Sequence, residues 1–174
     1  MLREAYERWP ALPMLWHVKF DHLLSSGRPQ AAAAFLMDPD ALPSGLGPAA
    51  VEQRQTLARA VDKEEPADVQ AVIDHYLRLA REDALNIAMA APIFSFFARA
   101  DLTFTSLERY YFNRGSFGKP ARIGPYTRRY TDPLFTMPMA AARTDPRFAR
   151  LVREIGLEAY WRETRTVPDY QRPV

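Results

Sequence analysis

Apolar residues recur along most of this chain at intervals of three and four positions, the spacing of a helix with one buried face. The first clear case covers residues 12–24 and stops before Gly27, a residue type that commonly ends helices. Pro29 then stands in the first turn of a second helix over residues 31–37, where its missing N–H costs nothing. Because the turn between them is short, these two helices are predicted to form an antiparallel hairpin over residues 12–37.

Proline and glycine interrupt the helical spacing after this hairpin. Residues 38–48 contain the densest run of both and are predicted to form a loop. Helical spacing returns between residues 49 and 112, where we expect helices over 51–61, 67–80, 84–98 and 107–112, with a turn at 101–105 before the last. The segment 84–98 is apolar on nearly every side, so it is predicted to be the most buried helix.

The periodicity disappears a second time over residues 113–133, which we interpret as a long ordered insert rich in Gly, Pro, Arg and aromatic residues. Beyond the insert, a C-terminal helical region over 134–165 is expected to contain helices at 134–143, 148–155 and 157–162, followed by a tail at 166–174. Asp145-Pro146 is a typical helix start, and Gly156 a typical end. Strand-like alternation never extends beyond a few residues, so the sequence predicts an all-α fold.

The length and composition favour one soluble domain. A chain of 174 residues with 48% hydrophobic residues can bury one substantial core. No apolar run approaches the roughly 18 residues of a membrane-spanning helix, and the charged N-terminus does not resemble a signal peptide. We therefore expect a cytoplasmic protein without a membrane span, or a periplasmic one if it is part of a membrane-anchored regulator. The absence of cysteine excludes disulfides, thiol catalysis and cysteine-ligated metals.

Two stretches carry a resemblance to a known family. Residues 15–32 have a bulky first helix, a glycine turn and an alanine-rich second helix, the layout of one tetratricopeptide repeat. Residues 145–157, Asp-Pro-Arg-Phe-Ala-Arg-Leu-Val-Arg-Glu-Ile-Gly-Leu, resemble the end of the tetratricopeptide-like C-terminal region of bacterial winged-helix transcriptional regulators and related sensor proteins. This resemblance implies a right-handed solenoid of helical hairpins, interrupted by the insert, that acts as a protein-binding or sensory module in a bacterial regulatory system.

The distribution of charge indicates which half of the chain would meet an anionic partner. The formal net charge is only +2. Residues 1–100 carry 10 basic and 13 acidic side chains, a net charge of −3, whereas residues 101–174 carry 13 basic and 8 acidic, a net charge of +5. Arginine and tyrosine are enriched where protein interfaces carry their energy. We predict that a protein or peptide partner contacts the cationic and aromatic residues of the insert: Arg114, Phe117, Lys119, Arg122, Tyr126, Arg128, Arg129 and Tyr130.

Two alternative binding partners stay open for this chain, a nucleic acid and a small molecule. The insert could stack on bases and neutralise phosphates, but the low net charge and the lack of a nucleic-acid-binding motif make nucleic acid the less favoured partner. A small molecule could instead bind in the aromatic interior, since helical bundles host such sites. That interior is expected to consist of Trp16, Phe20, Phe35, Phe94, Phe96 and Phe97.

Candidate catalytic and metal-binding chemistry is sparse. His17 and Asp21 are four residues apart on a predicted helix, with His22 adjacent, but a fourth ligand for a structural metal is missing. No phosphate-binding loop, nucleophile elbow or zinc-protease motif is present. We therefore expect no catalysis, no metal and no cofactor. A basic stripe beside the apolar face of the predicted helix 148–155, formed by Arg147, Arg150 and Arg153 at three-residue spacing, is interpreted as a solvated face partly paired with Glu154 and Glu158.

Overall fold

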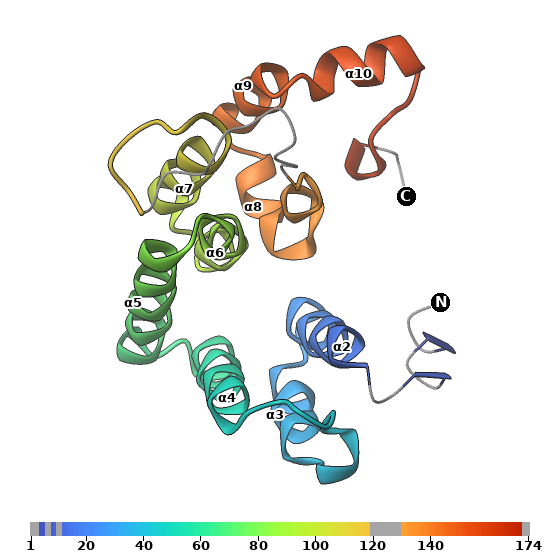
Figure 1. Cartoon of the computed structure of the whole chain (residues 1–174), viewed down its shortest axis with the longest axis vertical. Coiled ribbons are helices and arrows are strands. Elements are labelled where there is room, and N and C mark those ends of the chain that lie inside the picture. The colour runs from blue at the N-terminus through green and yellow to red at the C-terminus, as the bar shows by residue number, and fades with distance from the viewer. Residues whose placement is uncertain (1–3, 6–7, 10–11, 119–129, 172–174) are drawn as a thin grey trace. The chain divides into compact units, whose positions relative to one another are not determined.

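The computed structural model describes residues 4–5, 8–9, 12–118 and 130–171, and all regular structure within these ranges is helical (Figure 1). The all-α prediction is therefore confirmed. The contacts divide the chain into two compact units, residues 1–72 and 73–174. Within the described residues no helix is long and apolar enough to cross a membrane.

The first unit contains the expected N-terminal hairpin. Helix α2 (Pro13–Ser25) packs against α3 (Pro29–Met37), and the turn between them uses Gly27 at φ +71°. The side chains of Trp16 and Phe20 are fully buried between these helices and their neighbours. Both helices begin with a proline, and Pro29 of α3 occupies the first-turn position that the sequence predicts.

Helix α4 (Pro48–Lys63) packs on α3 after a loop that contains the short 3-10 turn η1 (Pro39–Ala41). It begins three residues before the expected start because Pro48 lies in its first turn. Glu64 ends it in the left-handed conformation, φ 52°, and α5 (Pro66–Glu82) begins two residues later. The boundary between the two units falls inside α5.

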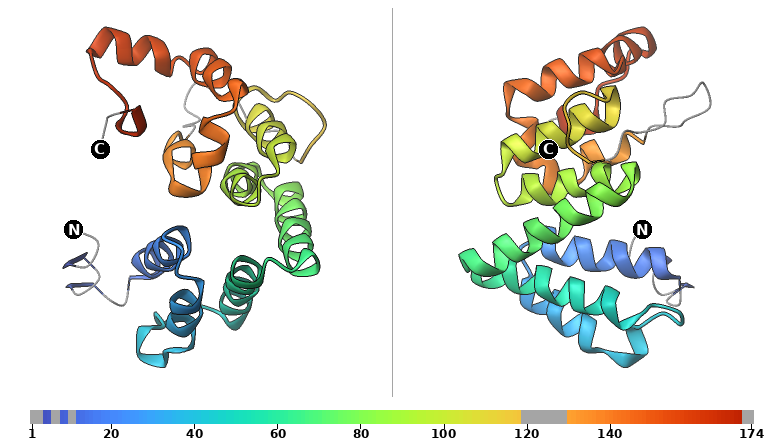
Figure 2. Two further views of the ribbon diagram at one scale, coloured as in Figure 1. Left: turned by 180° about the vertical axis from the view of Figure 1, so that it is seen from behind. Right: turned by 60° about the vertical axis from the view of Figure 1, so that its left-hand side comes forward.

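The second unit is built around α6 (Ala84–Phe96), which packs against α7 (Ala100–Phe112) as seen from behind in Figure 2. The predicted turn at 101–105 is wrong, because α7 already starts at Ala100 and the chain reverses at Ala98, φ 54°. The hydroxyl of Thr103 donates to the carbonyl of Arg99 inside the helix. Serine and threonine often favour turns through such local bonds, but here the bond satisfies a buried hydroxyl within α7.

The C-terminal part of the second unit is less regular than expected before residue 140. The predicted helix over 134–143 is wrong over its first six residues, which form the 3-10 turns η2 (Asp132–Phe135) and η3 (Met137–Met139) before α8 (Ala140–Arg143). Pro133 and Pro138 lack the N–H that a continuous α-helix needs. Regular helices follow: α9 (Pro146–Glu154), α10 (Leu157–Thr164) and the 3-10 turn η4 (Asp169–Gln171).

Local signals in the sequence set the ends of α9. The Asp145 carboxylate accepts the N–H of Arg147 at 2.9 Å, as an N-cap should. Gly156 follows the helix at φ +88°. Phe148, Leu151 and Val152 form the buried face and join one core cluster with α6 and α7.

The aromatic residues expected in the interior divide into two groups. Trp16, Phe20 and Phe35 are buried and in ring contact, and Phe94 is fully buried on α6. Phe96 and Phe97 are only half-buried at the end of α6, where they contact each other edge-to-face at 5.5 Å. Most of α6 is nevertheless buried, although Leu85 and Met89 are exposed on one side of it.

Candidate functional site

Both ends of the insert lie in the second unit, and they carry three of the eight residues predicted to bind a partner. Arg114, Phe117 and Tyr130 are described, whereas the other five lie outside the described residues: Lys119, Arg122, Tyr126, Arg128 and Arg129. Phe117 packs against the core cluster and is half-buried. Tyr130 has 53% of its surface exposed.

Arg109 holds the first end of the insert through the backbone. Its Nη1 donates to the carbonyls of Asn113 at 3.2 Å and Gly115 at 2.8 Å, and its Nη2 donates to the carbonyl of Gly118 at 3.3 Å. Three carbonyls of one segment thus converge on one guanidinium. A rigid guanidinium with several donors suits such an arrangement better than a lysine would.

Gly118 brings the same segment into close contact with α5 and α6. Its φ is +63°, and a Cβ built on it would lie 2.5 Å from the carbonyl oxygen of Ala80 and 2.9 Å from Cδ1 of Ile87. No other residue type fits both the backbone conformation and the available space. The insert therefore leaves α7 along a defined path as far as residue 118.

Two adjacent tyrosines of α7 hold the other end of the insert. The Tyr110 hydroxyl accepts the backbone N–H of Tyr130 at 3.0 Å, and the Tyr111 hydroxyl donates to the carbonyl of Tyr130 at 2.6 Å. Both tyrosine side chains are otherwise buried. The backbone of Tyr130 is therefore fixed on α7 while its ring stays exposed. We call the contacts made by Arg109, Tyr110 and Tyr111 the insert clamp.

Arg114 is engaged within the second unit. Its guanidinium forms a two-pronged ion pair with the Glu154 carboxylate of α9 and lies over the ring of Phe112 at 4.6 Å. The hydrogen bond from Arg114 holds the pKa of Glu154 below its usual value. Because its charge is neutralised there, Arg114 contributes less to recognition of an anionic partner than the sequence suggested.

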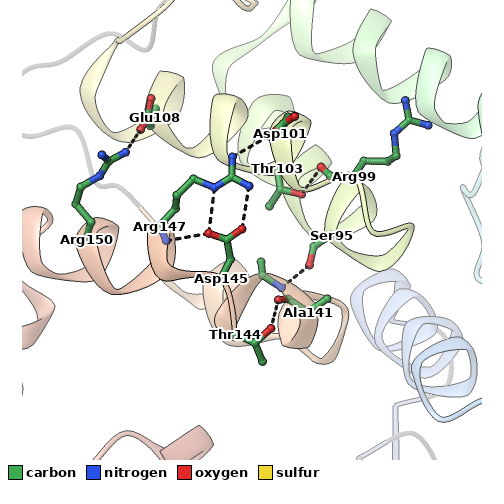
Figure 3. Close-up of polar contacts among 11 residues, drawn as sticks. Ser95, Arg99, Asp101, Thr103, Glu108, Ala141, Thr144, Asp145, Arg147 and Arg150 are labelled. Carbon is green, nitrogen blue, oxygen red and sulfur yellow. Dashed lines mark hydrogen bonds and ion pairs between the residues drawn. The ribbon is translucent and has the colours of Figure 1, made fainter.

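The three arginines of α9 also have carboxylate partners, which Figure 3 shows for two of them. Arg147 bonds Asp145 and Asp101, each at 2.8 Å, and hydrogen bonds to these carboxylates raise its pKa. Arg150 pairs with Glu108 at 3.1 Å.

Arg153 pairs with Glu158 at 2.9 Å, as the sequence suggested. Glu154, expected to pair along α9, pairs with Arg114 instead. The α9 face is thus a network of ion pairs in which each arginine has a carboxylate beside it.

The histidines occupy separate environments. His17 is half-buried with Nδ1 enclosed and without a hydrogen-bond partner, and burial, followed by the charge of Arg54, lowers its pKa. Asp21 forms an ion pair with Arg54 rather than facing a ligand site. Among the residues that the structure describes, no group of three or more His, Cys, Asp or Glu could hold a metal ion.

A groove that the sequence did not indicate lies between α9, α10 and the C-terminal segment. Its volume is about 450 Å³, and aromatic and charged side chains share its walls. They include Phe148, Trp161 and Tyr170 beside Arg143 and Arg162. These residues come from four separate elements, so no periodicity along the chain connects them.

Comparisons of the chain with protein-family models, with curated proteins and with solved structures gave no match. The resemblance of residues 15–32 and 145–157 to tetratricopeptide-like regions therefore stays a prediction from the sequence.

Proposed function

We propose that this chain is a non-catalytic protein-interaction module, and that its insert, residues 113–133, contacts an acidic surface of a protein or peptide. The observation that carries this proposal is the insert clamp. Three neighbouring side chains of α7 hold the two ends of the insert through buried or half-buried polar groups: those of Arg109, Tyr110 and Tyr111. Fixing the ends of a loop lowers the entropy lost on binding, which is the advantage of a preorganised interface.

The sequence of the insert supports an acidic partner. Lys119, Arg122, Arg128 and Arg129 follow one another without an intervening carboxylate, and aromatic residues stand among them. Charge complementarity accelerates association and selects partners. The arginines of α9 are already paired with carboxylates, so they add little cationic surface for nucleic acid. A protein surface is thus favoured over a nucleic acid.

The wider role follows the resemblance. Helices α2 and α3 form a hairpin over residues 15–32, the first stretch of the resemblance. Helix α9 and its Asp145 cap fall within residues 145–157, the second stretch. Both observations are compatible with a tetratricopeptide-like region of a bacterial regulatory or sensory protein. In that role the module would work in the cytoplasm, or in the periplasm as part of a membrane-anchored regulator.

The test is capture of proteins from a bacterial lysate treated with nuclease, using the wild-type chain and the Arg128→Ala/Arg129→Ala variant. The matched control is Arg78→Ala/Arg81→Ala, which removes the same charge from exposed positions on α5. We expect wild type and control to retain the same proteins and the insert variant to lose them. Poly-L-glutamate in excess should compete for the wild-type chain.

Two results would contradict the proposal. If the insert variant retains the same proteins as wild type, the insert is not the contact surface. If only nucleic acid is retained, and nuclease abolishes the capture, the module binds nucleic acid instead. Circular dichroism of all three chains verifies that the substitutions leave the helices intact.

A further inference from the structure

The groove of the second unit has an aromatic wall built from distant parts of the chain. Tyr170, in the C-terminal segment, stacks on Phe135 at 5.7 Å and meets Phe148 and Trp161 edge-to-face at 6.0 and 6.3 Å. Three of these rings, those of Phe148, Trp161 and Tyr170, line the groove. Trp161 and Tyr170 are half-buried, so part of each ring stays accessible to a ligand.

Cations outnumber anions among the other lining residues. Arg143, Arg153 and Arg162 line the groove, and Glu158 is the one carboxylate among the described lining side chains. Arg153 pairs with Glu158. Within the described part of the chain, neither Arg143 nor Arg162 has a carboxylate at ion-pair distance. Two cations of this groove are therefore not neutralised by the described side chains around them.

Arg143 is held in place at the groove without losing its charge. Its Nη1 donates to the carbonyls of Leu134 at 3.3 Å and Thr136 at 2.8 Å, and its guanidinium lies over the Tyr170 ring at 5.7 Å. Neutral carbonyls and a ring position this guanidinium but do not neutralise it. Burial lowers the pKa of Arg143, which agrees with a cation that lacks a counterion. Its remaining donors are available to an acceptor that enters the groove.

We propose that this groove binds a small organic anion, a carboxylate or a phosphate ester carried on a flat apolar group. The ring of the ligand would contact Trp161 and Tyr170, and its anionic group would be held by Arg143 and Arg162. A volume of about 450 Å³ lies within the range of small-molecule sites, roughly 300–1,000 Å³. Guanidinium groups bind carboxylates and phosphates alike through charge-assisted hydrogen bonds. This groove does not depend on the proposed protein interaction.

The experiment uses the ¹⁵N-labelled full chain and four probes: phenylacetate, phenyl phosphate, neutral phenylacetamide and acetate. Binding is followed at the indole N–H of Trp161, one of three tryptophan side-chain signals, which the Trp161→Phe variant assigns. We expect saturable shifts with the two aromatic anions, at dissociation constants near the millimolar range typical of fragments. Phenylacetamide and acetate should each bind at least about fivefold more weakly, because one lacks the charge and the other the ring. Comparison of phenylacetate with phenyl phosphate then shows which anionic group the site prefers.

Three variants test the roles of the charges. Arg162→Gln removes an exposed cation that lines the groove and should weaken phenylacetate binding about tenfold, the loss of one charge-assisted hydrogen bond. Arg165→Gln removes an exposed cation that does not line the groove and should change the binding less than twofold. Glu158→Gln removes the carboxylate that occupies Arg153 and should tighten the binding.

The proposal would be overturned by equal affinity for phenylacetate and phenylacetamide, since the cations would then contribute nothing. It would also be overturned if Arg162→Gln bound phenylacetate as tightly as wild type, or if Glu158→Gln bound it more weakly. Arg162 and Glu158 are exposed, so these variants leave the core intact, and the signals of residues distant from the groove verify this.

Discussion

Gly118 shows how much one residue decides at the start of the insert. Its positive φ and its contact with the backbone of Ala80 both exclude a side chain. Gly115, three residues earlier, shares the positive φ, +72°, but a Cβ there would meet nothing within 4 Å. A side chain at position 115 would therefore meet only backbone strain, whereas a side chain at position 118 would meet the same strain and a steric clash.

We expect Gly118→Ala to lower the free energy of unfolding by about 2–4 kcal/mol, the sum of left-handed strain and overpacking against backbone. Gly115→Ala is the matched control and should cost about 1 kcal/mol, because only the conformational strain applies. Urea unfolding followed by circular dichroism measures both. Equal losses in the two variants would mean that residue 118 does not approach α5 and α6 as described.

At the scale of an element, α7 is both a core helix and the support of the insert. One face of it, with Phe104 and Leu107, belongs to the core cluster, while its last turn presents Arg109, Tyr110 and Tyr111 to the insert. The hydroxyls of the two tyrosines contact the same residue, Tyr130, through its N–H and its carbonyl. Loss of either hydroxyl leaves a backbone group of Tyr130 without its partner.

Tyr110→Phe and Tyr111→Phe should each lower the free energy of unfolding by about 1–2 kcal/mol, the cost of an unsatisfied polar group. Tyr160→Phe removes a hydroxyl from an exposed tyrosine on α10 and should cost less than about 0.5 kcal/mol. Hydrogen exchange gives a more local readout, since the amide of Tyr130 should lose protection in Tyr110→Phe. Unchanged protection there would show that the clamp does not hold this end of the insert.

At the scale of the whole molecule, several ionisable groups favour folding at neutral over acidic pH. Burial lowers the pKa of His17 and of His75, so each is neutral in the folded protein at pH values where the unfolded chain binds a proton. Nδ1 of His17 and Nε2 of His75 are enclosed without partners, so protonation would place an unsatisfied N–H in the interior. The unfolded state thus takes up more protons as the pH falls below 6.5.

The stability contributed by the neutral histidines should therefore be complete above pH 6.5 and be lost as the pH falls from there towards their lower folded pKa values. Arg147 and Arg114 lower the pKa values of Asp145 and Glu154, which adds a further loss below about pH 4. Urea unfolding at pH 7, 6 and 5 measures the first effect.

The His17→Gln/His75→Gln variant should have a shallower decline of stability between pH 7 and 5 than wild type. His22→Gln, at an exposed position, should decline like wild type. If the double variant lost stability between pH 7 and 5 as steeply as wild type, groups other than His17 and His75 would cause the decline.

The sequence by itself determined the helical character of this protein and the ends of several helices, because these depend on neighbours along the chain. Apolar spacing, the Asp145 cap and the glycines at 27 and 156 act within one or two turns. The start of α7 was missed because its threonines also favour turns, and only burial against α6 decides that they lie in a helix.

Only the tertiary structure decided what surrounds the candidate sites. The insert clamp joins Arg109 and the tyrosines of α7 to residues up to 20 positions away, and Arg114 meets Glu154 across 40 positions. The groove is lined by residues between Arg143 and Tyr170 whose spacing along the chain follows no helical period. Whether a cation is neutralised depends on which carboxylate the fold places beside it. The distance between the two groups depends on how the helices pack, and the order of residues along the chain does not specify it.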